Sequence, residues 1–140
     1  MSKRVDNTEC HCLKMRRSAE NVIRFYDAIL APCGVTVRQY SLLNAISEQS
    51  GCNVRMLSEA TLLDRSTLAR SLKPLIQSGY IKDNKAAGTR DRVLELTEKG
   101  EDVRKEAADL WQLAQRQFEA KLSKEQLTAL EDTLALLQDL

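Results

Sequence analysis

The sequence predicts a mainly α-helical protein with a small β-hairpin wing, namely a winged helix-turn-helix domain flanked by N- and C-terminal dimerisation helices. Three observations support this fold class. Two short helical segments joined by a tight turn precede a polar hairpin, the apolar periodicity changes from helical to alternating after Gly79, and long amphipathic segments lie on both sides. A chain of 140 residues is expected to form one domain. The winged unit is predicted over about 35–97, and the dimerisation helices over about 8–31 and 98–140.

The first long segment has a helical pattern from about residue 9 to residue 30, with apolar residues on one face and basic residues on the other. The Ala-Pro-Cys-Gly sequence at 31–34 ends this helix, because proline and glycine interrupt helices. Thr36 and Gln39 then form a capping box for a second helix, in which the threonine oxygen accepts a backbone amide and the glutamine reaches back.

Two short helices follow. Asn53 is a suitable N-cap for the first of them, which is expected to end at the break over 61–63. Asp64 caps the second, and Gly79 stands where a left-handed residue is favoured after a helix. Pro74 lies inside this second helix and is expected to kink it after the first two turns, because proline lacks an amide donor.

The hairpin and the last two helices complete the predicted order. Strands are expected over 80–83 and 92–96, with a polar, glycine-containing loop over 84–91 between them. Thr97 then caps a long helix, and Ser123 opens the last helix with a second capping box.

The exposed face of the second short helix holds the candidate DNA-binding residues. Its leucines share the opposite face and are expected in the core. The major groove of DNA admits a helix, and arginine pairs with guanine edges there. The predicted contacts from the helix are Arg65, Ser66, Thr67, Arg70, Lys73 and Gln77. The predicted contacts from the wing, toward the backbone or the neighbouring minor groove, are Lys85, Arg90 and Arg92.

The charge distribution agrees with this assignment, although the net charge is only +1. From Asn53 to Arg92 there are eight basic and four acidic residues, whereas from Val93 onward there are six basic and eleven acidic residues. The basic middle is therefore the part suited to a polyanion, because each neutralised phosphate releases counterions.

The order and spacing of these segments resemble the MarR family of bacterial transcriptional regulators, from about residue 10 to the end of the chain. The resemblance implies a triangular homodimer with interlocking terminal helices, whose two winged domains enter successive major grooves of a pseudo-palindromic operator. The segments that resemble the family are 35–40, 57–60, 63–72, 75–81 and 94–100.

The wing departs from the pattern of the family. Wings of MarR-type proteins usually contain Asp-x-Arg, in which the aspartate braces the arginine that enters the minor groove. Alignment on Leu96-Thr97 places Arg90 at the arginine position but Gly88 at the aspartate position. Two interpretations stay open: Asp91 serves as the brace, or the wing is looser.

Dimerisation is also supported by apolar stripes that one small core is not large enough to bury. An intramolecular hairpin of the last two helices is the alternative. The stripe residues are Leu127, Leu130, Leu134 and Leu137 on the last helix, with Leu110, Leu113 and Ala114 on the long helix.

Two mechanisms of release from DNA stay open, since regulators of this kind respond to a signal that biases the spacing of their lobes. One is a small aromatic or lipophilic inducer, bound between the dimer helices and the winged domain near Tyr26, Tyr40 and Trp111. The alternative for these aromatic residues is a place in the core.

The other mechanism is oxidation of a thiol. Cys12 falls, by the resemblance, at the position of the peroxidatic cysteine of organic-hydroperoxide repressors, and Tyr26 matches one of the tyrosines beside it. Arg16 and Val37 occupy the other two tyrosine positions. Arg16, one helical turn away, favours a thiolate at Cys12. Against this, a cysteine on a helix is most often a small apolar filler.

Other function classes are disfavoured. The single histidine, with no glycine-rich phosphate loop and no paired carboxylates, provides no catalytic constellation, so an enzyme is not expected. The Cys10-His11-Cys12 sequence has no second ligand cluster, so neither a metal nor another cofactor is expected. The N-terminal segment lacks the apolar region of a signal peptide, no stretch is long enough to span a bilayer, and the four cysteines are expected as reduced thiols in the cytoplasm.

The sequence therefore predicts a sequence-specific regulator of transcription that binds double-stranded DNA, most simply a repressor. A winged-helix module that binds another protein, without specific DNA binding, is the alternative, because the fold alone does not determine function.

Overall fold

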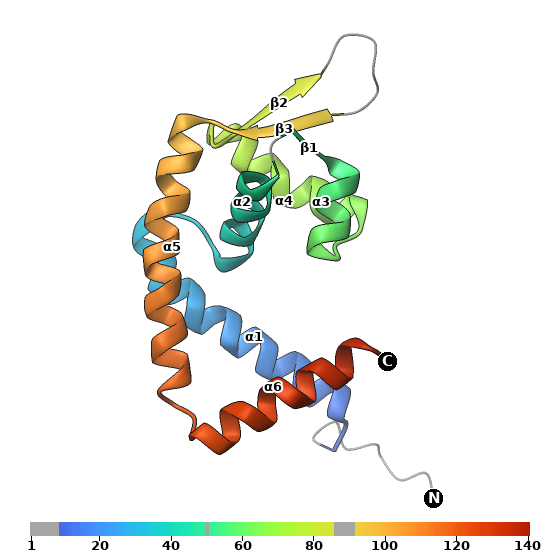
Figure 1. Ribbon diagram of the computed structural model, residues 1–140, viewed down its shortest axis with the longest axis vertical. Coiled ribbons are helices and arrows are strands. Elements are labelled where there is room, and N and C mark those ends of the chain that lie inside the picture. The colour runs from blue at the N-terminus through green and yellow to red at the C-terminus, as the bar shows by residue number, and fades with distance from the viewer. Residues whose placement is uncertain (1–8, 50, 86–91) are drawn as a thin grey trace, which may run out of the picture.

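The structure is a computed structural model that describes residues 9–49, 51–85 and 92–140. A winged unit lies at one end of the long helix α5, and α1 and α6 lie toward the other end (Figure 1). The elements in chain order are α1 (His11–Leu30), a short 3-10 helix η1 (Ala31–Cys33), α2 (Val37–Glu48), β1 (Cys52–Asn53), α3 (Val54–Thr61), α4 (Arg65–Gln77), β2 (Ile81–Lys85), β3 (Arg92–Leu96), α5 (Glu98–Glu119) and α6 (Lys124–Gln138).

The predicted fold class is confirmed, because helices α2, α3 and α4 pack beside a small antiparallel sheet. The sheet has the order β1-β3-β2, with Cys52 opposite Leu94 and Ile81 opposite Leu96. Strand β1 was not predicted, since two residues are too short to show an alternating pattern. Strand β2 extends to Lys85, which pairs with Arg92, so the hairpin ladder is longer than the sequence pattern indicates.

The helix starts are where the sequence places them. Thr36 Oγ1 accepts a hydrogen bond from the Gln39 amide at 3.1 Å, and Gln39 Oε1 accepts one from the Thr36 amide at 2.9 Å. Asn53 caps α3, and Ser123 opens α6 with the second capping box. Each cap satisfies amides that would otherwise lack a partner in the first turn. Helix α4 continues through Pro74 to its last residue.

The core is built from residues of helices α1 to α5 and of the three strands of the sheet. The predicted apolar face of α4 is confirmed, with Ile76 half-buried at its edge. Leucines fill most of the interior. The removal of their apolar surface from water is the main favourable contribution to folding. The most deeply buried leucines are Leu30, Leu42, Leu43, Leu57, Leu68, Leu72, Leu75 and Leu94.

The turn between α3 and α4 contains backbone strain. Leu62 has φ +58°, the one positive φ at a non-glycine residue in the described ranges, and its side chain is 89% exposed. A left-handed conformation costs a residue with a Cβ roughly 1–2 kcal/mol. The Ser58 hydroxyl donates to the Leu63 carbonyl at 2.6 Å, and this bond helps to hold the turn in spite of that cost.

The first turn of α5 is fixed to the segment that follows α4. The Thr97 amide donates to the Tyr80 carbonyl at 3.0 Å, and its hydroxyl donates to the Gly79 carbonyl at 2.5 Å. The Lys99 ammonium donates to the Ser78 carbonyl at 3.1 Å. Gly100 packs directly on the Tyr80 backbone, where an added Cβ would lie 2.0 Å from the carbonyl oxygen. Helices α4 and α5 are therefore joined by backbone contacts.

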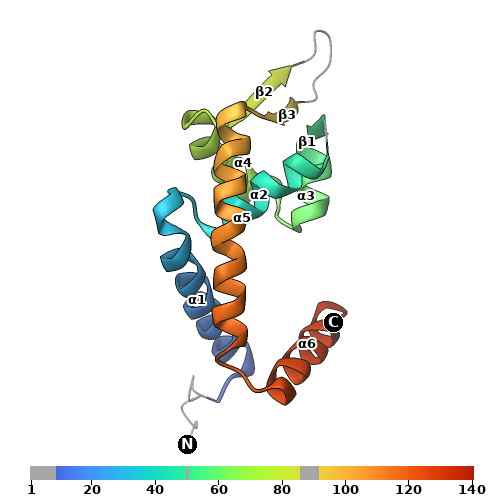
Figure 2. The same cartoon turned by 60° about the vertical axis from the view of Figure 1, so that its left-hand side comes forward.

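Helix α6 does not form the hairpin with α5 that was the alternative to dimerisation. It leaves the end of α5 in a different direction from α1, as Figure 2 shows, and none of its residues is buried. One predicted stripe residue needs correction: Ala114 is fully buried inside the protomer and adds no outer surface. None of the helices in the described ranges is long and apolar enough to cross a membrane.

Candidate DNA-binding surface

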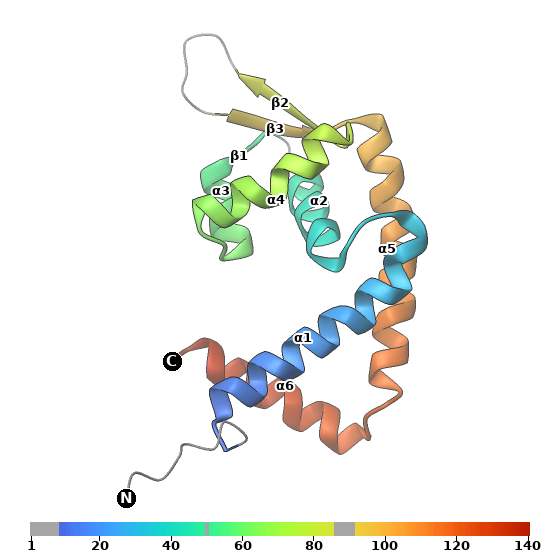
Figure 3. The same ribbon diagram turned by 180° about the vertical axis from the view of Figure 1, so that it is seen from behind.

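Helix α4 lies across one side of the winged unit (Figure 3). The side chains of its predicted DNA-binding face are exposed or half-buried. Its leucines face inward, and steps of three and four residues along a helix keep the polar side chains on the other face. Thr67 is half-buried in the first turn. The exposed members of the predicted set are Arg65, Ser66, Arg70, Lys73 and Gln77.

The N-terminus of α4 is ordered by Asp64. Its Oδ1 accepts the Thr67 amide at 2.7 Å and the Ser66 hydroxyl at 3.0 Å. The bond from the Thr67 backbone is the largest cause that lowers the pKa of Asp64 below its ordinary value. The carboxylate thus accepts hydrogen bonds from its own helix, and it fixes the turn that presents Arg65, Ser66 and Thr67.

The lowered pKa of Asp64 predicts how stability depends on pH. A carboxyl with a depressed folded pKa stabilises the protein above its unfolded pKa, about 3.9 for aspartate. That stabilisation is lost as the pH falls through the folded value. In Asp64→Asn the amide oxygen still caps the helix but does not titrate in this range. We expect the unfolding midpoints of wild type and variant to differ at pH 7 and to converge toward pH 3, measured by circular dichroism. A constant difference over this range would contradict the assignment.

The cations on the face of α4 are available to an outside anion. Within the described ranges, neither Arg70 nor Lys73 has a carboxylate at ion-pair distance, and Arg70 has only a 3.5 Å contact with the Thr67 hydroxyl. Arg38, which sequence reasoning missed, is exposed at the start of α2. It lines a hollow of about 280 Å³ together with Thr67 and Ser71 of α4. In the sequence, Arg38 could have been identified by its position two residues after the Thr36 cap, in a first helical turn without acidic residues.

The wing is only partly described, and its one described arginine has a partner. Arg92 Nη2 and Nε lie 2.6 and 2.7 Å from Asp83 Oδ2, across the hairpin. Asp83 was not among the predicted residues, because its diagonal placement relative to Arg92 depends on the register of the strands. Arg90 and the two alternatives at Gly88 and Asp91 lie outside the described residues, and the Lys85 side chain is likewise not described.

Comparison with known proteins gives the same assignment. A model of the MarR family matches residues 34–90. The HTH-type transcriptional regulator SarZ of Staphylococcus epidermidis is 30% identical over 108 residues, which cover 76% of this chain and 73% of SarZ. The solved structure of the M. tuberculosis transcriptional regulator MosR in complex with DNA is 30% identical, with a TM-score of 0.81, and the match covers 94% of this chain and 96% of MosR. The chain belongs to the MarR family.

The similarity to MarR proteins extends over the whole fold. A cysteine-to-serine mutant of E. coli MarR, solved with operator DNA, superposes with a TM-score of 0.83 at 18% identity, over 96% of this chain and 99% of that one. The resemblance inferred from the sequence is thus confirmed. The chain is a DNA-binding transcriptional regulator of the winged-helix type.

The aromatic residues predicted to line an inducer site of this MarR protein fall into two groups. Tyr40 and Trp111 lie together, with ring centroids 6.1 Å apart. Tyr26 instead packs with Phe25 and Phe118, and its hydroxyl donates to Gln115 Oε1. Burial is the main cause that raises the pKa of Tyr26 and also that of Tyr40. The three predicted residues therefore belong to the same core, but Tyr26 lies in a different group of aromatic rings from Tyr40 and Trp111.

The candidate redox residue of this MarR protein, Cys12, is exposed near the start of α1. Arg16, expected to favour its thiolate, lies 3.5 Å from Glu20. That partner lies one turn farther along α1, so the guanidinium shares its charge with a carboxylate. The thiols of Cys33 and Cys52 are buried, and Cys10 is half-buried at the N-cap of α1.

Proposed function

We propose that the chain acts as a homodimer that binds a pseudo-palindromic operator in double-stranded DNA and represses transcription. The observation that supports this most directly is the outer face of α4, which is exposed, basic and free of acidic residues from Arg65 to Gln77. A helix with this face fits the major groove, and half-sites one helical turn apart, about 34–36 Å, suit a dimer.

In this proposal Arg65, Ser66, Thr67 and Arg70 contact base edges, and Lys73 and Gln77 contact the flanking backbone. Arg38 adds a phosphate contact from α2, on the side of the hollow that it shares with α4. The proposed wing contacts are Lys85, Arg90 and Arg92. Arg92 is already paired with Asp83. In this proposal its guanidinium therefore binds a DNA phosphate and the Asp83 carboxylate at the same time.

The homodimer is supported by apolar surface that the protomer leaves uncovered. All of residues 11–20 are exposed, including Leu13 and Met15 of α1. On α6, Leu134 is 48% and Leu136 is 74% exposed. Large apolar side chains left exposed on two helices at the same end of the protomer indicate an interaction site. A second copy of the same chain would cover both helices.

Two routes of release belong to the proposal. The contact of Tyr40 with Trp111 joins the winged unit to α5, so a small aromatic inducer that separates these rings would change the lobe angle. The exposed thiol of Cys12 is accessible to an oxidant. Mass spectrometry after peroxide treatment tests the oxidation route, because a Cys12 that stays an unmodified thiol while DNA binding persists excludes oxidant sensing. We propose a binding protein of the cytoplasm, without catalytic activity.

The test of the function is an Arg70→Ala variant of the full chain. The probe is a duplex that the wild-type protein selects from a random pool. We expect the affinity of the variant to fall roughly 10- to 100-fold, equivalent to about 1–3 kcal/mol, and base preference to relax at one position in each half-site. Fluorescence anisotropy over a range of salt concentrations measures both effects.

Arg24→Ala is the matched control. Arg24 is exposed on α1, outside the winged unit, and its replacement by alanine removes the same charge. Its affinity should equal that of the wild type. A wild-type chain without salt-dependent, selective binding to duplex DNA would refute the proposal and favour a module that binds another protein.

A further inference from the structure

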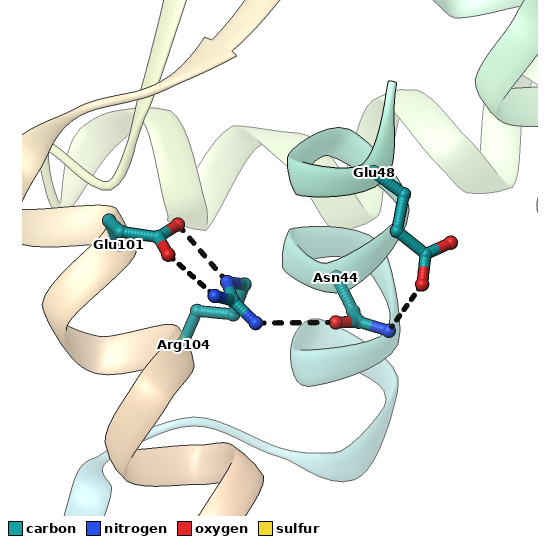
Figure 4. A network of polar contacts seen from close by, with 4 residues as sticks. All are labelled: Asn44, Glu48, Glu101 and Arg104. Carbon is teal, nitrogen blue, oxygen red and sulfur yellow. Dashed lines mark hydrogen bonds and ion pairs between the residues drawn. The ribbon is translucent and has the colours of Figure 1, made fainter. Parts of the chain in front are cut away.

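A polar network joins α2 to α5 one turn beyond the backbone contacts described above (Figure 4). Arg104 of α5 pairs with Glu101 on the same helix through two bonds, Nη2 to Oε1 at 2.5 Å and Nε to Oε2 at 3.0 Å. Its third nitrogen, Nη1, donates to Asn44 Oδ1 on α2 at 3.5 Å. The Asn44 amide in turn donates to Glu48 Oε1 at 3.4 Å. One guanidinium therefore connects two helices.

The pair within α5 is strong and the contacts that lead to α2 are weak. Hydrogen bonding to Arg104 is the main cause that lowers the pKa of Glu101, and the same bond raises the pKa of Arg104. Both groups thus stay charged around neutral pH, and the Arg104 side chain is only 19% exposed. The planar guanidinium has donors in fixed directions. Glu101 orients the guanidinium, so the position of Asn44 is constrained by direction as well as by distance.

The network lies in the part of α5 that packs against α2, between the contacts at the start of α5 and the contact of Trp111 with Tyr40. Thr97 and Gly100 fix the start of α5 to the residues after α4, as described above. Contacts at one end of a helix leave rotation about that end possible. The contact of Arg104 with Asn44, one turn farther along, restrains this rotation, because it attaches α2 at a second place.

We propose that Arg104 is a positioning residue which, through Asn44, sets the angle between the winged unit and α5 and thereby the half-site spacing that the homodimer accepts. The inference rests on the proposed function. Helix α5 extends from the winged unit toward the proposed dimer helices α1 and α6 (Figure 1), so it acts as a lever between the dimer and α4. A small change of angle at the network displaces α4 along the DNA.

The experiment compares wild type with Arg104→Ala and Asn44→Ala, each as the full chain. The probes are the selected duplex and two versions of it with one base pair added or removed between the half-sites. For each protein we measure the ratio of the affinity for the best spacing to that for the altered spacings. Because both affinities come from one preparation, the ratio does not depend on the fraction of folded protein.

We expect this ratio to fall about fivefold in both variants, while base preference within a half-site stays the same. Arg104→Lys should keep part of the ratio, since lysine retains the charge but lacks the planar fork. Lys105→Ala is the matched control, because it removes an exposed cation from the neighbouring position of α5 and should leave the ratio unchanged.

The two proposals fail in different ways. An unchanged ratio in Arg104→Ala and Asn44→Ala, even with uniformly weaker binding, overturns the positioning role and leaves the function intact. An equal fall in Lys105→Ala also overturns it, since general loss of charge would then be the cause. A wild-type chain that selects no duplex overturns both proposals.

Discussion

Gly100→Ala is expected to lower the free energy of unfolding by about 3 kcal/mol or more, at or above the usual limit for overpacking, or to prevent folding altogether. A Cβ at this position would lie 2.0 Å from the Tyr80 carbonyl oxygen and 2.8 Å from the carbonyl carbon. Both contacts are with backbone, so no side-chain rotation relieves them. The same oxygen accepts the Thr97 amide, and a shift of the chain would break that bond. Urea denaturation followed by circular dichroism measures the loss.

Gly79→Ala provides the matched comparison for Gly100→Ala. Gly79 has φ +78°, but an added Cβ there meets nothing within 4 Å. Its cost is confined to the left-handed backbone, about 1–2 kcal/mol. Both variants replace a glycine by alanine. Gly100→Ala introduces a steric clash, whereas Gly79→Ala introduces only local backbone strain. Equal losses of stability in the two variants would show that α5 can move away from Tyr80 at no further cost. The connection between α5 and the segment after α4 would then not be rigid.

The features that sequence predicted well are those that depend on neighbours along the chain. A cap needs the capping residue and an amide two or three positions later, so Thr36, Asn53, Asp64 and Ser123 all cap the helices expected of them. The outer face of α4 was predictable for the same reason, because helical periodicity places the side chains once the start at Arg65 is known.

The features that sequence missed depend on how distant segments meet. Asn44 and Arg104 are 60 positions apart, and no local pattern brings them together. The pair of Asp83 with Arg92 requires the register of the hairpin, which the sequence does not specify on its own. For the same reason the sequence could not show that Tyr26 packs with Phe118, whereas Tyr40 packs with Trp111.

The direction of α6 could not be predicted either, because its leucines fit a hairpin with α5 as well as a dimer. The structure removes the hairpin, since α6 has no buried residue and leaves the end of α5 at an angle. Apolar side chains in water are unfavourable, so a helix of this kind needs a covering surface. In the proposed homodimer, the exposed apolar residues on α1 of a second copy would provide the matching surface.

Leu134→Glu is therefore expected to separate the homodimer while leaving the protomer folded. In the single chain Leu134 is 48% exposed, so a carboxylate there costs the protomer little. In the dimer the same carboxylate would be buried without a partner, which is among the most costly changes at an interface. We expect the dimer dissociation constant to rise by roughly 100-fold or more, since central apolar contacts dominate such interfaces. Analytical ultracentrifugation measures it directly.

Loss of the dimer should also weaken binding to DNA, because two linked winged units bind adjacent half-sites far more tightly than one. Thr128→Glu is the control: Thr128 is exposed on the polar side of α6, and its replacement adds the same charge. It should leave both mass and affinity unchanged. If Leu134→Glu stays dimeric and binds the operator as the wild type does, α6 is not in the interface. If it becomes monomeric but keeps full affinity, each winged unit reads DNA alone, and the lever formed by α5 has no role in spacing.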